Sequence, residues 1–472
     1  MQMINERTPA RLLAAPLILF VATHLAGCSG GGGLSGSAPL PNVEEPSGGQ
    51  WRTVLLASGS TLAVPPPPAA NGAVTAREVQ ELLSLQSSRT AAMRVSVNFW
   101  NAGAVIRWNE IARSLVTQHS TNPPVASRIY AYLSVAQYDA LVTAWHYKYL
   151  YRRPEPRQLN SSLVPLVATG PTPVYPSEHA TVAAASAAVL AFFYPTDAAL
   201  LTAKVREHQE SRLIAGVNFR SDIEAADALG RAVAAKAIER ARTDNSTSAG
   251  PGSFPSGPGN WNGINPLLPG WGDVKPWLMT SGSQFRPPAP PAFDSSEFRA
   301  ALAEVRQISN TRTPEQLRIA QFWADGPPGH WNEIASDLIA EHALNELRAA
   351  RTLALMNMAV MDAGICCWDA KYTYFYIRPF QVDPAITTPV GRPNFPSYTS
   401  GHSTFSGAAS EVLGYVFSDR QAVLRDMAEE ASISRVYGGI HYLFDCTEGL
   451  EGGRTIGQLA VQRGQADGSP GF

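Results

Sequence analysis

Apolar residues recur with helical periodicity along most of the chain, beginning near Ala76. The alternation of apolar and polar residues that marks β-strands is weak throughout the sequence. Small residues also run together inside helical stretches, as at positions 183–185, where three alanines lie beside Val182, Val189 and Leu190. Such a run is typical of a helix packed tightly in a bundle. The pattern predicts an all-α fold.

The chain also repeats itself at a constant spacing. The segment Trp108-Asn109-Glu110-Ile111-Ala112 recurs as Trp331-Asn332-Glu333-Ile334-Ala335, an offset of 223 that we call the repeat offset. At the same offset Ser177-Glu178-His179 matches Ser400-Gly401-His402, Ser211-Arg212 matches Ser434-Arg435, and Asp222 matches Asp445. Arg153-Pro154 matches Arg378-Pro379 at an offset of 225, which we interpret as a two-residue insertion or deletion.

These matches predict two homologous helical bundles in one chain, an N-terminal bundle at 91–245 and a C-terminal bundle at 296–472. The segment 246–295 between them has Gly and Pro throughout, so we expect long Pro/Gly-rich connecting loops. Trp261, Trp271 and Trp277 are its expected anchors.

The N-terminus carries a targeting pattern. Arg7 and Arg11 precede a short apolar stretch, and Leu25-Ala26-Gly27-Cys28 follows it. This resembles a bacterial lipoprotein signal, with a signal peptide at 1–27 and a lipid on Cys28; the alternative is an ordinary signal peptide with a chance cysteine. In such signals Ser29 favours the outer membrane, with the protein facing the periplasm or the cell surface.

The rest of the N-terminal region predicts a tether. Residues 28–90 are expected to be a lipid-anchored linker and lead-in, and Gly, Pro and Ser up to about residue 75 favour a spacer from the membrane. No later segment has 18 uninterrupted apolar residues, so the mature body is expected to be soluble.

Composition excludes some classes of protein. Apolar residues make up 45% of the 472 residues and charged residues 16%, which rules out a wholly disordered chain. The net charge of −2 shows no basic excess, so we expect no nucleic-acid partner. Helical bundles of low surface charge associate, which is compatible with a homo-oligomer. Four cysteines are too few for a disulfide scaffold, although Cys446 could pair with Cys366 or Cys367.

Polar residues of the second half form a set that suits a tetrahedral oxyanion. Lys371, Arg378 and Arg435 supply three positive charges. Ser400 offers a hydroxyl, and Gly401 lets a backbone N–H approach an anion at the start of a helix. His402 and His441 remain for chemistry, as ligand or nucleophile and as general acid/base.

In order and spacing these residues resemble a known signature. Lys-x6-Arg-Pro, then Ser-Gly-His, then Ser-Arg-x5-His-x3-Asp is shared by vanadium-dependent haloperoxidases and by the acid phosphatase and lipid phosphatase superfamily. The chain departs from it at Thr399, where the family usually has proline. Asp362-Ala363-Gly364-Ile365, Trp368 and Phe395, together with the two-bundle length, are similar to the haloperoxidase branch.

The resemblance implies a role for each residue. His441 would bond the vanadium of a vanadate cofactor, and His402 would be the acid/base on the opposite side. Trp368 and Phe395 would shape the halide pocket, and Asp445 would orient a basic residue. The equatorial oxygens would be held by Lys371, Arg378, Ser400, Gly401 and Arg435. The activity implied is oxidation of halide by hydrogen peroxide to a hypohalous-acid equivalent that halogenates an organic acceptor.

Two alternatives stay open from the sequence. A phosphatase of the same superfamily would use His441 to form a phosphohistidine and His402 to protonate the leaving oxygen. A non-catalytic envelope lipoprotein that binds phosphate is the third hypothesis. Which halide or organic acceptor is used does not follow from spacing.

The first half is expected to be a degenerate copy. Arg153, Ser177, His179 and Arg212 persist, but the sequence matches put His146 at the lysine position, Glu178 at the glycine position and Asn218 at the position of His441. We therefore predict a structural partner without its own reaction. The remaining histidines are expected to be helix caps or surface residues: His119, His208, His330 and His342.

Overall fold

The computed structural model describes residues 44–471. These residues fall within one compact unit. The predicted signal peptide, Cys28 and the first part of the spacer lie outside the described residues. Helices dominate and no strand is present in the described part, which has one isolated bridge, between Asn260 and Tyr376. The all-α prediction is confirmed.

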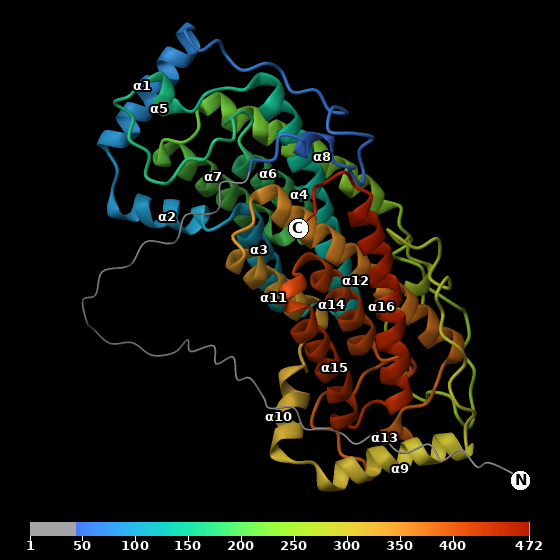
Figure 1. The fold of residues 1–472 in the computed structure, drawn as a ribbon. Helices are drawn as coiled ribbons and strands as arrows, with labels where there is room; N and C mark the ends of the chain where they lie inside the picture. The colour runs from blue at the N-terminus through green and yellow to red at the C-terminus, as the bar shows by residue number, and fades with distance from the viewer. Residues whose placement is uncertain (1–43, 472) are drawn as a thin grey trace, which may run out of the picture. The chain divides into compact units, whose positions relative to one another are not determined.

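Sixteen α-helices are found between residues 44 and 471 (Figure 1). Those of the first half are α1 (Ala73–Ser87), α2 (Ala91–Asn101), α3 (Ala104–Gln118), α4 (Pro123–Tyr151), α5 (Pro156–Leu159), α6 (Glu178–Phe193), α7 (Ala198–Ala215) and α8 (Arg220–Arg242). Those of the second half are α9 (Ser296–Thr311), α10 (Pro314–Phe322), α11 (Pro327–Glu341), α12 (Glu346–Tyr374), α13 (Pro379–Val382), α14 (Gly401–Val416), α15 (Gln421–Tyr437) and α16 (Leu443–Gln465).

The helix boundaries repeat with the offset seen in the sequence. Six helices of the first half begin at the repeat offset before a helix of the second half: α3, α4, α5, α6, α7 and α8 precede α11, α12, α13, α14, α15 and α16. The connection from α4 to α5 has the same length as the connection from α12 to α13. In the described structure neither connection therefore contains an insertion relative to the other. The predicted two-residue shift at Arg153-Pro154 is therefore wrong, and Glu155 stands at the position of Arg378.

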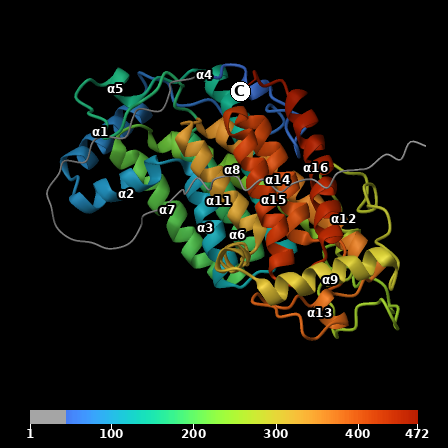
Figure 2. The same cartoon turned by 60° about the horizontal axis from the view of Figure 1, so that its bottom comes forward.

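The centre of the fold is formed by the two long helices α4 and α12, which pack against each other. Helices α6 and α8 pack on α4, while α14 and α16 pack on α12 (Figure 2). In length and composition α12 could span a membrane, but 94% of its most apolar window is buried inside the fold. It is therefore a core helix of this unit.

The segment before α1 is part of the folded body, contrary to the prediction of a spacer reaching residue 75. Trp51 is buried, and the backbone N–H groups of Val54, Leu55 and Leu56 donate to the carboxylate of Asp139 at 2.7–3.0 Å. Buried carboxylates need such donors. This segment is therefore held on α4 by a specific polar contact.

The connection between the halves is anchored in the same way. Backbone N–H groups of Trp277, Leu278 and Met279 donate to Asp362 on α12 at 2.7–2.9 Å, and Asp362 stands at the repeat offset from Asp139. Trp261 and Trp271 are buried, and the guanidinium of Arg240 lies 3.5 Å from the centre of the Trp277 ring. The three tryptophans anchor the connection, as predicted.

Candidate active site

The predicted site residues of the second half come from the ends of five helices. Lys371 lies in the last turn of α12, which stops where Phe375 adopts a left-handed conformation (φ 47°). Arg378 is the N-cap of α13, and Ser400 is the N-cap of α14. Arg435 lies in the last turn of α15, and His441 in the turn before α16. Helix ends suit this purpose because their backbone groups are free for ligands.

Three of these side chains are buried cations. Lys371 and Arg378 are 0% exposed and Arg435 is 1% exposed. Burial lowers the pKa of Lys371 to about 8 and those of Arg378 and Arg435 to about 10, because the charged forms lose their hydration. Within residues 44–471, no ion pair joins any of the three to a carboxylate, although a buried charge ordinarily requires a partner.

The loop between α13 and α14 holds two of the cations in place. The ammonium of Lys371 donates to the carbonyl oxygens of Pro396 at 3.0 Å and Ser397 at 2.8 Å, and to that of Thr399. Arg378 Nε donates to the carbonyl of Phe395 at 2.9 Å. Neutral carbonyls orient these side chains without neutralising their charge, so the positive potential remains available to an anion.

His441 is fixed in one tautomer. Its Nδ1 lies 2.8 Å from Asp445 Oδ2, and an ionised carboxylate only accepts, so Nδ1 carries the proton. Nε2 then presents its lone pair, toward which Arg378 Nη1 donates at 3.2 Å. Asp445 is itself fixed by Ser397 Oγ at 2.5 Å and by the N–H of Tyr442 at 3.2 Å. Asp445 thus orients a basic residue, as expected for it.

His402 is held from the other side by the end of α10. Its Nε2 lies 2.7 Å from the carbonyl oxygen of Trp323, so Nε2 donates and Nδ1 has the lone pair in the neutral ring. Burial, and then the charge of Arg435, keep the pKa of His402 well below its usual value. Arg435 Nη2 also donates to this region, to the carbonyl of Ala320 at 2.6 Å.

Two aromatic side chains form a wall beside the cations. The rings of Trp368 and Phe395 lie 5.0 Å apart. The Phe395 ring centre is 5.1 Å from the Lys371 ammonium and 5.0 Å from the Arg378 guanidinium. The structure therefore brings together the whole set proposed from the sequence, aromatic residues included.

Known proteins resemble this chain in sequence and in fold. Residues 351–467 match the family model of the PAP2 superfamily. Vanadium chloroperoxidase of Curvularia inaequalis is 26% identical over 190 residues, which is 31% of this chain and 31% of that protein. The structure of a bacterial vanadium-dependent iodoperoxidase matches with a TM-score of 0.61 at 26% identity, covering 76% of this chain and 96% of that one.

The last quarter of the chain thus matches the PAP2 superfamily, and the chain is similar in sequence and fold to vanadium-dependent haloperoxidases. The fold is shared more widely than the sequence: a bacterial vanadium-dependent chloroperoxidase in its apo form matches with a TM-score of 0.57 at only 15% identity, covering 73% of this chain and 95% of that one. The sequence match to the Curvularia inaequalis chloroperoxidase spans about a third of that relative's length.

The first half of this chain retains more of the candidate site than the sequence suggested. Lys148, not His146, stands at the repeat offset before Lys371, and its ammonium donates to Pro173 at 2.6 Å, as Lys371 does to Pro396. The assignment of His146 was wrong because it followed the apparent shift at Arg153. Arg153 instead pairs with Asp222 at 2.5 Å and Glu78 at 2.9 Å.

His208 was also misassigned. It is fully buried, accepts the indole N–H of Trp108 at 3.1 Å and lies 2.9 Å from His179 Nδ1. His119 and His342 are helix C-caps paired with aspartates, as expected. Nothing in the local sequence around His208 distinguishes it from a surface histidine, because its partners lie 29 and 100 residues away.

The cysteines near the site are free thiols. Cys366, Cys367 and Cys446 are buried and form no disulfide, so the pairing left open by the sequence is not present in the structure. Burial raises the pKa of the Cys446 thiol to about 12, which keeps it protonated.

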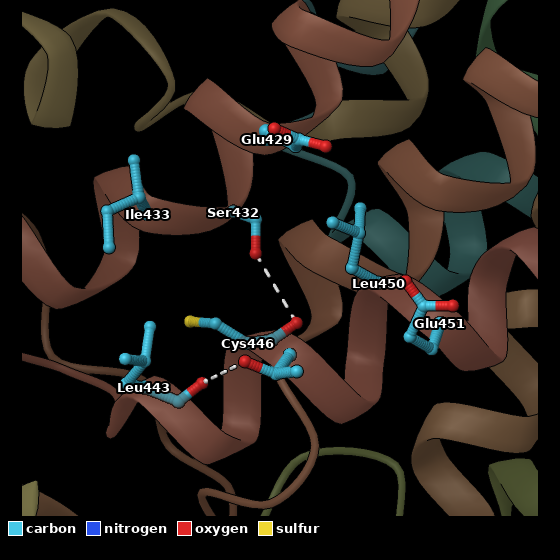
Figure 3. Close-up of a pocket in the computed structure, with 8 residues that line it drawn as sticks. Glu429, Ser432, Ile433, Leu443, Cys446, Leu450 and Glu451 are labelled. Carbon is cyan, nitrogen blue, oxygen red and sulfur yellow. Dashed lines mark hydrogen bonds between the residues drawn. The ribbon is translucent and has the colours of Figure 1, made fainter. Parts of the chain in front are cut away.

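Cys446 lines a small cavity between α15 and α16, of about 180 Å³ (Figure 3). Ser432 Oγ donates to the Cys446 carbonyl there at 3.3 Å. None of the predicted anion-binding residues lines this cavity, so it is separate from the site.

The motif spacing in the sequence did not identify the residues that support the site, either through a backbone carbonyl or by holding another supporting side chain. The carbonyl of Trp323 fixes His402, and the indole of Trp323 is in turn fixed by Glu430 Oε1 at 3.0 Å. Ser397 supports Asp445. The repeat offered one signal for them, because Trp100 and Glu207 form the same pair at 3.1 Å in the first half.

Proposed function

We propose that this chain is a vanadate-dependent haloperoxidase that oxidises halide with hydrogen peroxide to a hypohalous-acid equivalent. One observation carries the proposal: three buried cations that form no ion pair in the described part of the chain lie around His441, whose Nε2 lone pair is held ready by Asp445. Asp445 supplies one negative charge against these three, so the cluster keeps an excess of positive charge that favours binding of an anion.

The donor set fits vanadate. Lys371, Arg378 and Arg435 supply charge-assisted donors for its oxygens, and Ser400 and the N–H of Gly401 add neutral donors at the start of α14. His441 Nε2 supplies the single nitrogen ligand. When bound, vanadate supplies a Lewis acid that activates peroxide without changing its own oxidation state.

The protein residues divide the remaining work. His402 is neutral, because burial and Arg435 depress its pKa, and its Nδ1 can take a proton from incoming peroxide. Lys371 neutralises negative charge as it develops. Trp368 and Phe395 form an apolar side that favours a weakly hydrated halide over water.

The test compares the two oxyanion chemistries directly. The purified chain is freed of bound anion and divided between two assays. One contains orthovanadate, peroxide, halide and a phenolic or diketone acceptor, and the other a phosphomonoester without vanadate. Halogenation should require vanadate, and added phosphate should suppress it by competing for Lys371, Arg378 and Arg435.

The opposite result is equally clear. Efficient phosphoester hydrolysis, with no vanadate-dependent oxidation of chloride, bromide or iodide, would assign the site to the phosphatase reaction instead. A residual phosphatase activity beside halogenation supports the proposal, because phosphate and vanadate share shape and charge.

We further propose that the protein is exported and held at the outer membrane through a lipid on Cys28. The support is the sequence Leu25-Ala26-Gly27-Cys28-Ser29 after a short apolar stretch. Since the folded body begins by Glu45, which pairs with Arg348, about 17 residues separate Cys28 from it. Such a linker leaves the body free to meet peroxide and halide in solution.

A further inference from the structure

The first half carries the same positions as the proposed active site, with informative replacements. Lys148, Ser177, His179 and Arg212 stand at the repeat offset before Lys371, Ser400, His402 and Arg435 and have the same residue types. The three replacements are Glu155 for Arg378, Glu178 for Gly401 and Asn218 for His441. The copy therefore loses its nitrogen ligand and one arginine and gains two carboxylates. Glu155 pairs with Arg157 at 2.5 Å, so the carboxylate that concerns the anion position is that of Glu178.

That carboxylate lies among the retained donors. Glu178 Oε2 is 2.6 Å from the ammonium of Lys148. Burial would raise the pKa of Glu178, but Lys148, its own backbone N–H and Arg212 together lower it below its usual value. These three groups are the counterparts of Lys371, the N–H of Gly401 and Arg435, which are the donors proposed for the oxyanion in the second half.

The second half differs in the way this comparison requires. Gly401 has no side chain. The three cations of the second half form no ion pair with a carboxylate within the described residues. A Cβ built on Gly401 would meet only Trp368 at 3.6 Å and Phe405 at 3.8 Å, which are ordinary contacts. The glycine is thus not demanded by backbone packing; its effect is to leave the space in front of Lys371 open.

An independent observation shows that the first-half position still offers a donor. Arg212 is 6% exposed, and its Nε has no hydrogen-bond partner in the described part of the chain. The Glu178 side chain is 28% exposed, so the position can be reached from solvent. An anion that replaced the carboxylate would find Lys148, Arg212 and the first turn of α6 already in place, with Glu346 of α12 as a remaining negative charge 3.8 Å from His179.

We propose that the Glu178 carboxylate occupies, in the first repeat, the place that the second repeat keeps for the oxyanion. The first repeat is then a self-liganded copy of the anion site, closed to phosphate or vanadate by its own side chain. This inference rests on the proposed function of the second repeat as an oxyanion site. Its consequence is that the chain binds one exchangeable tetrahedral oxyanion rather than two.

The test removes the internal carboxylate and counts bound anions. Orthophosphate is titrated calorimetrically into the full chain and into Glu178→Gly, with Glu178→Ala as a second variant that keeps better helix propensity. The wild-type chain should bind one equivalent, and both variants two. Adding Lys148→Gln to Glu178→Gly should return the stoichiometry to one, because the retained ammonium is lost.

The reciprocal substitution tests the same idea in the other repeat. Gly401→Glu should place a carboxylate on Lys371 and abolish the equivalent bound by the wild-type chain. Gly401→Gln, which has the size of glutamate without its charge, is the matched control and should weaken phosphate binding less than Gly401→Glu does. Circular dichroism and thermal melts establish that each variant is folded.

The outcomes separate this inference from the proposed function. If the wild-type chain binds no phosphate but Glu178→Gly binds one equivalent, the proposed function of the second repeat fails, while Glu178 is still shown to fill an anion site in the first repeat. If folded Glu178→Gly and Glu178→Ala bind no more than the wild-type chain, the inference is overturned. Two equivalents bound by the wild-type chain would overturn it as well.

Discussion

Asn109 and Asn332, which occupy the same position in the two repeats, are hydrogen-bonded to each other: Asn109 Nδ2 donates to Asn332 Oδ1 at 2.7 Å. Ser134 and Asn357, also separated by the repeat offset, form a second such pair at 2.9 Å. Contacts between equivalent residues are the mark of a two-fold relation. The two repeats therefore meet through corresponding faces, with all four side chains buried.

This interface predicts that neither half is stable alone. Residues 271–472, expressed without the first half, would expose the face of α12 that packs on α4 and leave Asn332 and Asn357 without their partners. We expect an insoluble or unfolded product, rescued by co-expression of residues 1–270. Soluble yield and thermal melts measure this. A second half that folds cooperatively as a monomer would contradict it.

Removal of the proposed vanadium ligand should abolish turnover. His441→Ala and His402→Ala should each reduce vanadate-dependent halogenation by at least about 100-fold, the usual scale for loss of an acid/base or ligand group. The matched variants Asn218→Ala and His179→Ala should remain nearly fully active, because they alter the first repeat. A comparable loss in folded His179→Ala would reveal a working site there.

The support of His402 gives a sharper prediction. Glu430→Ala frees the indole of Trp323, whose carbonyl holds His402, so kcat should fall about tenfold, a typical effect of an outer-shell contact. Glu430→Gln, which can still accept the indole N–H, should restore most of it.

Glu207→Ala is the control for Glu430→Ala, since it breaks the equivalent contact with Trp100. Glu207→Ala should lower the free energy of unfolding as much as Glu430→Ala does, by about 1 kcal/mol, but it should leave kcat unchanged. Equal effects of the two alanine variants on kcat would show that Glu430 acts only through stability.

Two buried aspartates predict a pH effect on stability. Burial raises the pKa of Asp139 and of Asp362 from 3.8 to about 6. Between these values the folded state binds more protons than the unfolded state, so the stability contributed by each group is present below about pH 4 and is lost as the pH rises to about 6.

The measurement compares urea unfolding of the wild-type chain with that of Asp362→Asn from pH 4 to 7. Asparagine does not titrate, so the stability advantage of the wild type should shrink by about 2 kcal/mol over this range, at about 1.4 kcal/mol per unit of pKa. The stability advantage of the wild type over Asp139→Asn should shrink with rising pH in the same way. An advantage that grows with pH would show that the backbone donors, rather than burial, control these pKa values.

The lipid anchor is tested by Cys28→Ser. The substitution should abolish acyl labelling and release the protein from the membrane fraction, while halogenation by the released protein stays intact. Labelling is followed with a fatty-acid analogue and localisation by fractionation. A wild-type protein that carries no acyl label would show that residues 25–28 are an ordinary signal-peptide end.

Sequence alone predicted the helical class, and it contained the matching segments at the repeat offset and the candidate site residues of the second half. This was possible because spacing along a helix or a short loop limits where side chains can lie. Lys371, Arg378, Ser400, Arg435 and His441 each stand at or next to a helix end, and their motifs span few residues. Local patterns of this kind can be recognised in the sequence before the fold is known.

Only the tertiary structure decided which residues of the first half correspond to that site, and which distant groups complete it. The register that identifies Lys148 became visible from matching helix ends, and a chance match at Arg153-Pro154 concealed it in the sequence. The pairing of Glu178 with Lys148, the burial of His208 and the contact of Trp323 with His402 join residues 29 to 100 positions apart. Such contacts depend on how helices pack, and periodicity along one helix carries no information about them.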